Sequence, residues 1–476
     1  MSEGKRFFTA AEIEQMAKEE PSQLAHVALM QIAQLQQRAA QLKALRAELK
    51  QKEAHIAELQ KQLLEAQKAA LRQAAPFRVP EQKRSREPKR PGRPAGHPGA
   101  CRPRPQRIDE EIVLELERCA VCGGSQWRDQ HEIEQFIEEI PEPRPRVTRL
   151  RTYEAICACC GVEARSRHPL QTSQATGAAA VMLGPRALAV AADLNKSKGL
   201  SMRKTCAVLA DHFGLRLTAG GLSQALARVA AQVEPQYEQL HAALIAAPVL
   251  HVDETSWWVG GKPCWLWVFT WAKGTLYLVL QSRGREVLEA VLGQSFHGVL
   301  VSDCLSVYDL ESGQQQKCYA HHFKAIKAAK ALDTAHGEGF LQQLSDLLKS
   351  AMALGEKRSA IPGPEYQPQI AQLERASQEL LSTAREKAHE ESVRQRLFKQ
   401  KDHLFTFLRH DGVDATNNLA ERQLRPAVIT RKLSCGNKTA EGARTFGILA
   451  SLAATAAQNG QSFIAQIAHA MPLDSS

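Results

Sequence analysis

The sequence has 476 residues, of which 44% are hydrophobic and 24% charged, a globular composition with room for roughly two to four domains. An excess of 61 Lys and Arg over 51 Asp and Glu gives a net charge of +10, which favours a polyanionic partner without identifying it. The odd number of 11 cysteines, the lack of a signal-peptide core, and the lack of any apolar run near the roughly 20 residues of a membrane span argue against secretion and membrane insertion. We therefore expect a soluble, cytoplasmic protein whose thiols are reduced or metal-bound.

Residues 31–73 contain no Pro or Gly and repeat an apolar residue every seven positions. The repeated residues are Leu35, Leu42, Leu49, Ile56 and Leu63, and the position three residues after each of them mixes apolar and basic side chains. A period of seven that persists over about five heptads is typical of a coiled coil. The pattern predicts a homo-oligomer joined through this helix; a long solvated helix packed on the body of the protein is the alternative.

Residues 78–107 form a basic segment with ten Lys or Arg and seven Pro. Because proline at this density prevents helices and central strands, we expect an extended linker. Its sequence "KRPGRPAG" resembles the Gly-Arg-Pro core of short arms that enter an A/T-rich minor groove, which makes Arg90 and Arg93 candidate DNA contacts. A linker whose charge only aids solubility is the alternative.

Two copies of a Cys-x-x-Cys-Gly knuckle follow, at residues 119–123 and 157–161. Glycine after the second thiol permits a tight backbone turn, and four thiolates complete the tetrahedral shell of a structural Zn²⁺. We expect one zinc ion, with Cys159 as a spare thiol, bound by Cys119, Cys122, Cys157 and Cys160. The gap between the pairs is longer than in most zinc ribbons, and two metal-free turns are the alternative.

Two helices are expected between residues 201 and 233. The first ends at Gly214, and Thr218 stands where the second needs its N-cap. Two helices joined by a turn that contains glycine outline a DNA-binding helix-turn-helix, although any pair of packed helices fits this outline.

After Pro248 the hydrophobic pattern changes from helical to extended. Three strands are expected at "VLHVDETSW", "CWLWVFTW" and "TLYLVLQ", followed by a helix at "REVLEAVLG" and a fourth strand at "GVLVSD". This order describes an α/β layer. Residues 305–411 carry little strand signal and several helical stretches, which predicts a helical insertion.

Asp253 is expected to close the first of these strands and Asp303 the fourth. If the two strands are neighbours, both carboxylates share one site and repel each other unless a cation bridges them. Oxygen ligands of this kind suit Mg²⁺ or Mn²⁺. Taken singly, an aspartate at a strand end is more often a turn or helix cap.

The segment "ATNNLAERQLRPAVITRK" at residues 415–432 places one carboxylate, Glu421, among asparagines and basic residues. We expect Thr416 to cap a short helix that carries Asn417 and Glu421 on one face, and Pro426 to end or bend that helix. Glu421 would then complete a three-carboxylate site with the two aspartates. The basic side chains after it are either phosphate contacts or a solvated face, and they are Arg422, Arg425, Arg431 and Lys432.

Five segments together resemble the DDE transposases of bacterial insertion sequences, specifically the family named after insertion sequence sixty-six. They are "HVDETSW", "LVSDCLSVYD", "CYAHHFKAI", "NNLAERQLRPAVITRK" and "EGARTFGILASLAATAAQNG". The order of the leucine-rich helix, basic stretch, cysteine knuckles and helix-turn-helix is similar as well. The resemblance therefore covers nearly the full length.

The resemblance implies an RNase H-like core with a helical insertion and an acidic triad of Asp253, Asp303 and Glu421. Glu254 is rejected because adjacent strand residues point to opposite faces, and Asp309 because it lies beyond the strand. The implied reaction is cleavage at the element ends and transfer of the freed 3′-hydroxyl to target DNA, with two Mg²⁺ or Mn²⁺ ions. His321 and His322 either contact the scissile phosphate or cap a turn.

The implied partners are double-stranded DNA, further copies of the chain and small accessory proteins of the same element, at the bacterial nucleoid. We expect a multidomain α and α/β protein. Its expected parts are a coiled-coil region (1–76), a basic linker (77–110), a zinc-binding module (111–170), a helix-turn-helix domain (171–245), an RNase H-like core (246–310 and 411–433), a helical insertion (311–410) and a C-terminal helical region (434–476).

Two other functions share parts of this pattern. A catalytically silent DNA-binding protein or repressor of the same descent would not need three acids beside DNA, where carboxylates repel phosphate. An RNase H-like nuclease that hydrolyses without joining would use the same triad and differ only in its products.

Overall fold

The computed structural model describes residues 9–19, 21–71, 96, 99, 101–293, 296–309, 313–332 and 339–471. The chain divides into two compact units, Met1–Phe136 and Ile137–Ser476, which are considered one at a time. None of the helices formed by the described residues is long and apolar enough to cross a membrane. Arg90 and Arg93 of the basic linker lie outside the described residues.

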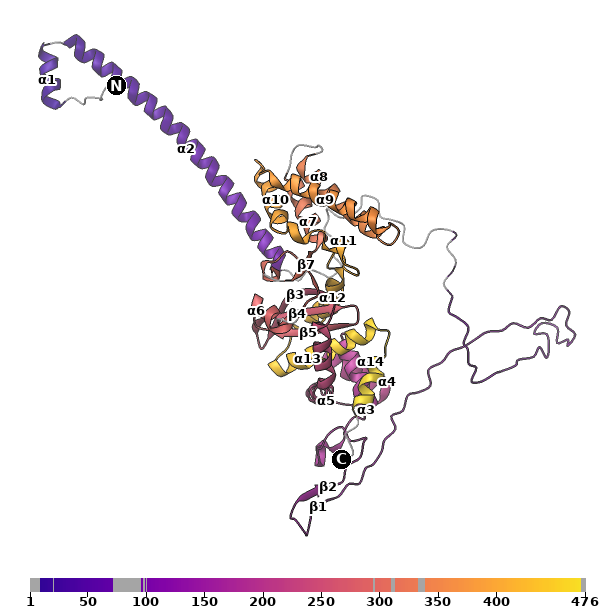
Figure 1. The fold of residues 1–476 in the computed structure, drawn as a ribbon. Helices are drawn as coiled ribbons and strands as arrows, with labels where there is room; N and C mark the ends of the chain where they lie inside the picture. The colour runs from indigo at the N-terminus through magenta and orange to yellow at the C-terminus, as the bar shows by residue number, and fades with distance from the viewer. Residues whose placement is uncertain are drawn as a thin grey trace. The chain divides into compact units, whose positions relative to one another are not determined.

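The first unit contains the helices α1 (Ala10–Glu19) and α2 (Pro21–Leu71), which are drawn in indigo and violet in Figure 1. α2 is a single helix of 51 residues and includes the predicted heptads. The four heptad side chains that the structure describes are exposed by 64% at Leu35, 56% at Leu42, 60% at Leu49 and 53% at Ile56. The predicted helix is present, and its apolar seam is uncovered in the single chain, so the coiled coil stays a prediction.

The second unit is built on a five-stranded mixed sheet with the order β5-β4-β3-β6-β7. Its strands are β3 (Val249–Val259), β4 (Lys262–Trp271), β5 (Gly274–Leu280), β6 (Val299–Ser302) and β7 (Gln314–Lys317). The first three are antiparallel, whereas β6 and β7 run parallel to β3. The four expected strands and the helix before the fourth, α6 (Arg285–Leu292), are present; the fifth strand, β7, is an addition that the sequence does not predict.

One face of the sheet shares a hydrophobic core with helices that precede the strands in the sequence and with helices that follow them. These helices are α3 (Pro185–Ala192), α4 (Met202–Phe213), α5 (Ala219–Ile245), α13 (Ala440–Gln458) and α14 (Phe463–Ala470). Strand alternation supplies the sheet's side of this core, with Trp267 and Phe269 on this face and Leu266 and Val268 on the other. The region predicted to bind DNA and the C-terminal helices therefore pack on the same layer.

The two helices of the predicted helix-turn-helix are α4 and α5. Gly214 ends α4 with a φ of 67°, and the Thr218 hydroxyl accepts the N–H of Gly221 at 3.0 Å to cap α5. Much of α5 is buried in the shared core, including Leu226 and Val229. The helices are where the sequence places them, and their contact with DNA stays a prediction.

A helical segment follows β7 in the sequence and precedes Asn418. It consists of α7 (Tyr319–Lys330), α8 (Phe340–Glu356), α9 (Gly363–Ser382), α10 (Ala388–Lys399) and α11 (Thr406–Arg409). These helices, drawn in orange in Figure 1, form a second core that includes Leu344, Ile370 and Leu397. α12 (Asn418–Ser434) follows them and covers the other face of the sheet through Ala420, Leu424 and Ala427.

Candidate active site

Asp253 and Asp303 stand beside each other on the central strands of the sheet. β3 pairs in parallel with β6 from Val249 opposite Val299 to His251 opposite Val301, and the same register continued two residues brings Asp253 to Asp303. Asp303 follows β6 directly, as expected. The expectation that Asp253 closes its strand is wrong, because β3 continues along β4 as far as Val259. Asp253 instead lies where β3 passes the end of its parallel neighbour.

The electrostatics of Asp253 reflect a gathering of acids. Burial, the largest cause, and the charges of Glu254, Asp303 and Glu421 together raise the pKa of this carboxyl to about 7, while the N–H of Glu254 opposes the shift. Asp303 accepts the N–H of Leu305 at 2.8 Å. Carboxylates gathered in this way are stabilised by a divalent cation with a preference for oxygen ligands.

The two rejected acids are engaged elsewhere. Glu254 has a side chain only 2% exposed, bonded to Arg283 at 2.6 Å and to the hydroxyl of Tyr308, on the face opposite to Asp253. Asp309 forms ion pairs with the buried Lys317 at 3.2 Å and with Lys399 at 2.7 Å. Both carboxylates already have cationic partners.

The position of Glu421 is fixed by Asn417 at the start of α12. The N-cap of this helix is Asn417 and not Thr416, and the amide of Asn417 does not cap the helix but binds β3. Its Nδ2 donates to the carbonyl of Val252 at 2.8 Å, and its Oδ1 lies 3.1 Å from Nδ1 of His251. The N–H of Glu421 donates to the carbonyl of Asn417 at 3.2 Å, so the glutamate stands one helical turn from this anchor.

α12 does not end at Pro426. It continues to Ser434, because residues on both sides of the proline pack against the sheet. Packing outweighs the loss of one helical hydrogen bond at this position. The basic residues predicted to contact DNA are therefore on a longer helix than the sequence suggests.

Those basic residues differ in their surroundings. Arg422, Arg425 and Lys432 are exposed. Arg431 is half-buried, and its guanidinium donates to the hydroxyls of Thr255 at 2.9 Å and Ser256 at 2.7 Å. Arg431 thus joins α12 to β3, whereas the other three are free to face solvent or a ligand.

Cys318 is a residue of this site that the sequence interpretation missed. It precedes α7, and its Sγ accepts the N–H of Asn417 at 3.1 Å. The donor atoms of Cys318, His321 and Glu421 all lie within 4.8 Å of one another. Burial raises the pKa of the Cys318 thiol, an effect that N–H donors from Asn417 and His321 oppose. The Cys-x-x-His spacing at the start of a helix is the sequence signal that points to this pair.

The neighbouring His322 points into the protein. It is completely buried, with Nε2 at 3.6 Å from Sγ of Cys304. Burial, the largest cause, and the charges of Arg396, His321 and Lys317 together lower its pKa to about 3. His321 is therefore the histidine of the pair that stands at the acids.

The cysteine knuckles have the local geometry that the sequence predicts. Gly123 and Gly161 have φ values of 73° and 71°, and their N–H groups donate to the carbonyls of Cys119 at 2.9 Å and Cys157 at 2.8 Å. Backbone N–H donors lower the pKa of the Cys119 and Cys157 thiols. The second knuckle joins β1 (Glu154–Ile156) to β2 (Glu163–Arg165). The pairs belong to different units, so their joint binding of zinc stays a prediction.

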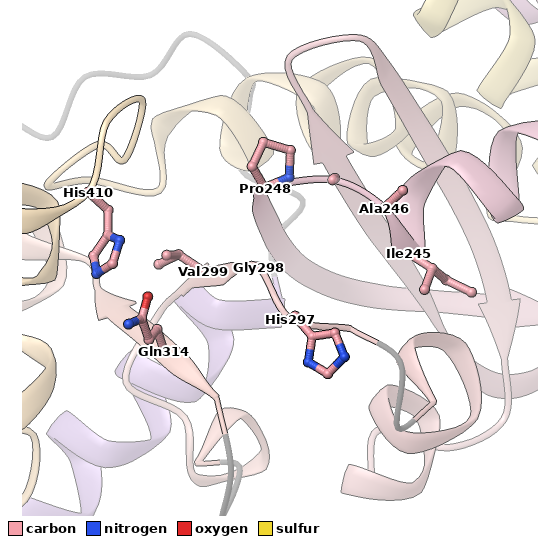
Figure 2. A pocket seen from close by; sticks show the side chains of 9 residues that line it. Ile245, Ala246, Pro248, His297, Gly298, Val299, Gln314 and His410 are labelled. Atoms are coloured by element: carbon pink, nitrogen blue, oxygen red, sulfur yellow. The ribbon is translucent and has the colours of Figure 1, made fainter.

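A cavity of about 410 Å³ lies at the other end of the parallel strands (Figure 2). Its lining includes Pro248 before β3 and the first residues of β6 and β7, Val299 and Gln314. The acids stand at the carboxyl ends of these strands, where α/β sheets place their chemistry. The cavity is therefore separate from the candidate active site.

The chain matches a model of a known protein family. The family model described as "Transposase IS66 family" matches residues 180–445, which is more than half of the chain. The matched region contains the whole sheet, α12 and all three acids of the candidate site. A search of curated proteins found no match.

Proposed function

The chain belongs to the Transposase IS66 family, and on this premise we propose that it binds the ends of an insertion sequence and catalyses cleavage and strand transfer of DNA. The observation that carries the proposal is the gathering of three carboxylates. Asp253 and Asp303 are neighbours across two parallel strands, and Glu421 stands on a helix that is anchored to β3, the strand of Asp253. The charges of both other acids act on Asp253.

The three acids fit a divalent-metal centre, in agreement with the metal use that the family suggests. Asp253, Asp303 and Glu421 would hold Mg²⁺ or Mn²⁺, two ions in all, which supply charge stabilisation to both the attacking and the leaving oxygen. The protein's own part is orientation. Asn417 fixes the turn of α12 that carries Glu421, and the β3–β6 register fixes the two aspartates.

We assign the contacts with DNA to the exposed basic residues of α12. Arg422, Arg425 and Lys432 are on the helix that carries Glu421, and their charge would offset the repulsion between the acids and the phosphates. Arg90, Arg93 and the α4–α5 pair are further candidates for binding the element ends. Arg431 is better assigned to holding α12 on the sheet.

The remaining assignments concern assembly. We propose that the four knuckle thiolates of Cys119, Cys122, Cys157 and Cys160 bind one structural Zn²⁺. The exposed seam of α2 is proposed to join copies of the chain. Small accessory proteins of the same element are proposed as further partners, and the bacterial nucleoid as the place of action.

The decisive experiment compares wild type with Asp303→Asn on labelled element-end duplex and Mg²⁺. We expect wild type to cleave and join the DNA, and the variant to bind it without cutting. Equal cleavage by both proteins would remove Asp303 from the catalytic role. Cleavage without joining would favour the hydrolytic nuclease, and binding without cleavage by wild type would favour the repressor.

A further inference from the structure

The donor set around Glu421 differs in chemistry from the aspartate pair. We propose that Cys318, His321 and Glu421 form a second metal site, selective for Zn²⁺ or a similarly soft divalent ion, that competes with the catalytic centre for Glu421. When this site is filled, Glu421 is withdrawn from Asp253 and Asp303 and the protein is inhibited. The inhibitory part rests on the proposed function, whereas the metal site stands on the geometry alone.

The spacing of the donors suits one ion. Cys318 directly precedes α7 and His321 lies in its first turn, so a separation of three residues puts both on one face of the helix. Their donor atoms and a Glu421 oxygen lie within 4.8 Å of one another. Tetrahedral zinc with bonds of about 2.0–2.3 Å needs donors about 3.5 Å apart, which small rotations of these side chains supply.

The chemistry of the donors selects the ion. Thiolate and imidazole favour zinc over Mg²⁺, which prefers oxygen ligands. One thiolate and one carboxylate neutralise a divalent charge, and binding releases the thiol proton. Three protein ligands leave a fourth position open.

Two local features prepare the site. The N–H of Asn417 donates to Sγ of Cys318 at 3.1 Å, so the residue that anchors α12 also orients the thiol. His321 has a buried Nδ1 without a hydrogen-bond partner within the described part of the chain. A buried nitrogen in this condition is satisfied when the ring coordinates an ion or binds an outer ligand.

Sharing of Glu421 follows from the distances. Within the part of the chain that the structure describes, Cys318, His321 and Glu421 lie together within 4.8 Å, and the trio of Asp253, Asp303 and Glu421 does not meet that limit. The Glu421 carboxylate can closely bind either an ion held by Cys318 and His321 or an ion held by the two aspartates, but not both. A soft ion bound at Cys318 and His321 therefore opposes assembly of the catalytic site with Asp253 and Asp303.

The site is tested by counting zinc bound to the full-length protein after dialysis against buffered zinc. We expect Cys318→Ser and His321→Gln each to hold one ion fewer per chain than wild type, whatever the knuckle cysteines hold. Serine is a good N-cap, so Cys318→Ser is expected to fold. Cys304→Ser, which removes the thiol beside the buried His322, is the matched control and is expected to keep the wild-type count.

Cobalt gives a second readout. Co²⁺ bound by a thiolate absorbs in the near ultraviolet, and part of this absorption is expected to disappear in Cys318→Ser but not in Cys304→Ser. Equal zinc counts and equal cobalt spectra in wild type and Cys318→Ser would overturn the site.

Inhibition is tested by adding zinc to the DNA cleavage reaction in excess Mg²⁺, with each protein compared with its own rate without zinc. We expect half-inhibition of Cys318→Ser to need at least about tenfold more zinc than wild type, the loss typical of a removed metal contact. Equal sensitivity, with one zinc fewer bound, would overturn the sharing of Glu421. A wild type that cuts no DNA would overturn the proposed function and the inhibitory role, and the zinc count would still decide the site.

Discussion

The surroundings of the Asp253 carboxyl disfavour its charged form. It is partly buried, and the charges of Glu254, Asp303 and Glu421 add to the effect of burial in raising its pKa to about 7. The folded protein therefore retains a proton on Asp253 that the unfolded chain has lost by about pH 4. Folding stability falls as the pH rises through this interval, and the penalty is complete above pH 7.

Asp253→Asn is accordingly expected to raise the melting temperature in EDTA at pH 8. The amide removes a buried negative charge, and each kcal/mol recovered raises the melting temperature of a chain of this size by about 1 °C. Thermal melts at pH 8 and pH 5 check this, because the gain should shrink at the lower pH. Excess Mg²⁺ should stabilise wild type more than the variant, and equal melting temperatures at both pH values would contradict the charge argument.

The site could be predicted only in part from its residues. Asp253 and Asp303 are visible because each follows a run of apolar strand residues, and Glu421 because its segment resembles a known family. For Cys318 the Cys-x-x-His spacing indicates only a pair with His321, and its place in the site depends on contact with Asn417, 99 positions away. The error at Thr416 has the same origin, because Asn417 serves a strand distant in sequence.

At the scale of single elements, β7 shows why the sequence predicted four strands instead of five. Its sequence is Gln-Gln-Gln-Lys, without an apolar residue, yet Gln315, Gln316 and Lys317 are buried. Polar partners in the insertion compensate for this burial. Oε1 of Gln316 accepts the N–H of Phe407 at 2.9 Å, and Lys317 pairs with Asp309. Hydrophobic periodicity cannot predict a strand that is stabilised by polar contacts with residues distant in the sequence.

Gln316→Ala is expected to destabilise the protein by about 1–3 kcal/mol, because it leaves the N–H of Phe407 buried without its acceptor. Chemical denaturation monitored by circular dichroism measures the change. Gln314→Ala, at the exposed first position of the same strand, is the matched control and is expected to change stability by less than about 0.5 kcal/mol. Equal effects of the two variants would remove the buried amide as a source of stability.

α12 carries basic residues with two different roles. Arg425 is exposed, whereas Arg431 bonds to Thr255 and Ser256 of β3. We expect Arg425→Ala to weaken DNA binding and to lower the slope of log affinity against log salt by about one, because one phosphate contact is lost. Arg431→Ala is expected to lower the melting temperature more than it weakens DNA binding. Fluorescence anisotropy at several salt concentrations, combined with thermal melts, separates the two; an unchanged salt slope in Arg425→Ala would exclude that phosphate contact.

At the scale of the whole molecule, the sequence predicts the order of the modules better than the contacts between them. Heptads, knuckle turns and the β3–β6 strands are encoded in short stretches, and the helices, turns and strands they predict are present. Assembly depends on partners that lie far apart or on other chains. The shared core that joins α3–α5 to α13–α14 across the sheet is an example, since no short stretch reveals it. The predicted pairing of the two knuckles, which belong to different units, and the predicted association of α2 with a second copy would be of the same kind.

The exposed seam of α2 makes the oligomer testable. Leu42 and Leu49 are more than half exposed in the single chain, and burial against a second helix would remove this apolar surface from water. The double change Leu42→Asn with Leu49→Asn is expected to convert the oligomer to monomers at micromolar concentration, as measured by sedimentation velocity. The control changes Lys43 and Lys50, one position further along the same heptads, to Asn and should leave the oligomer intact. A wild type that sediments as a monomer would contradict the coiled coil and return α2 to a solvated helix.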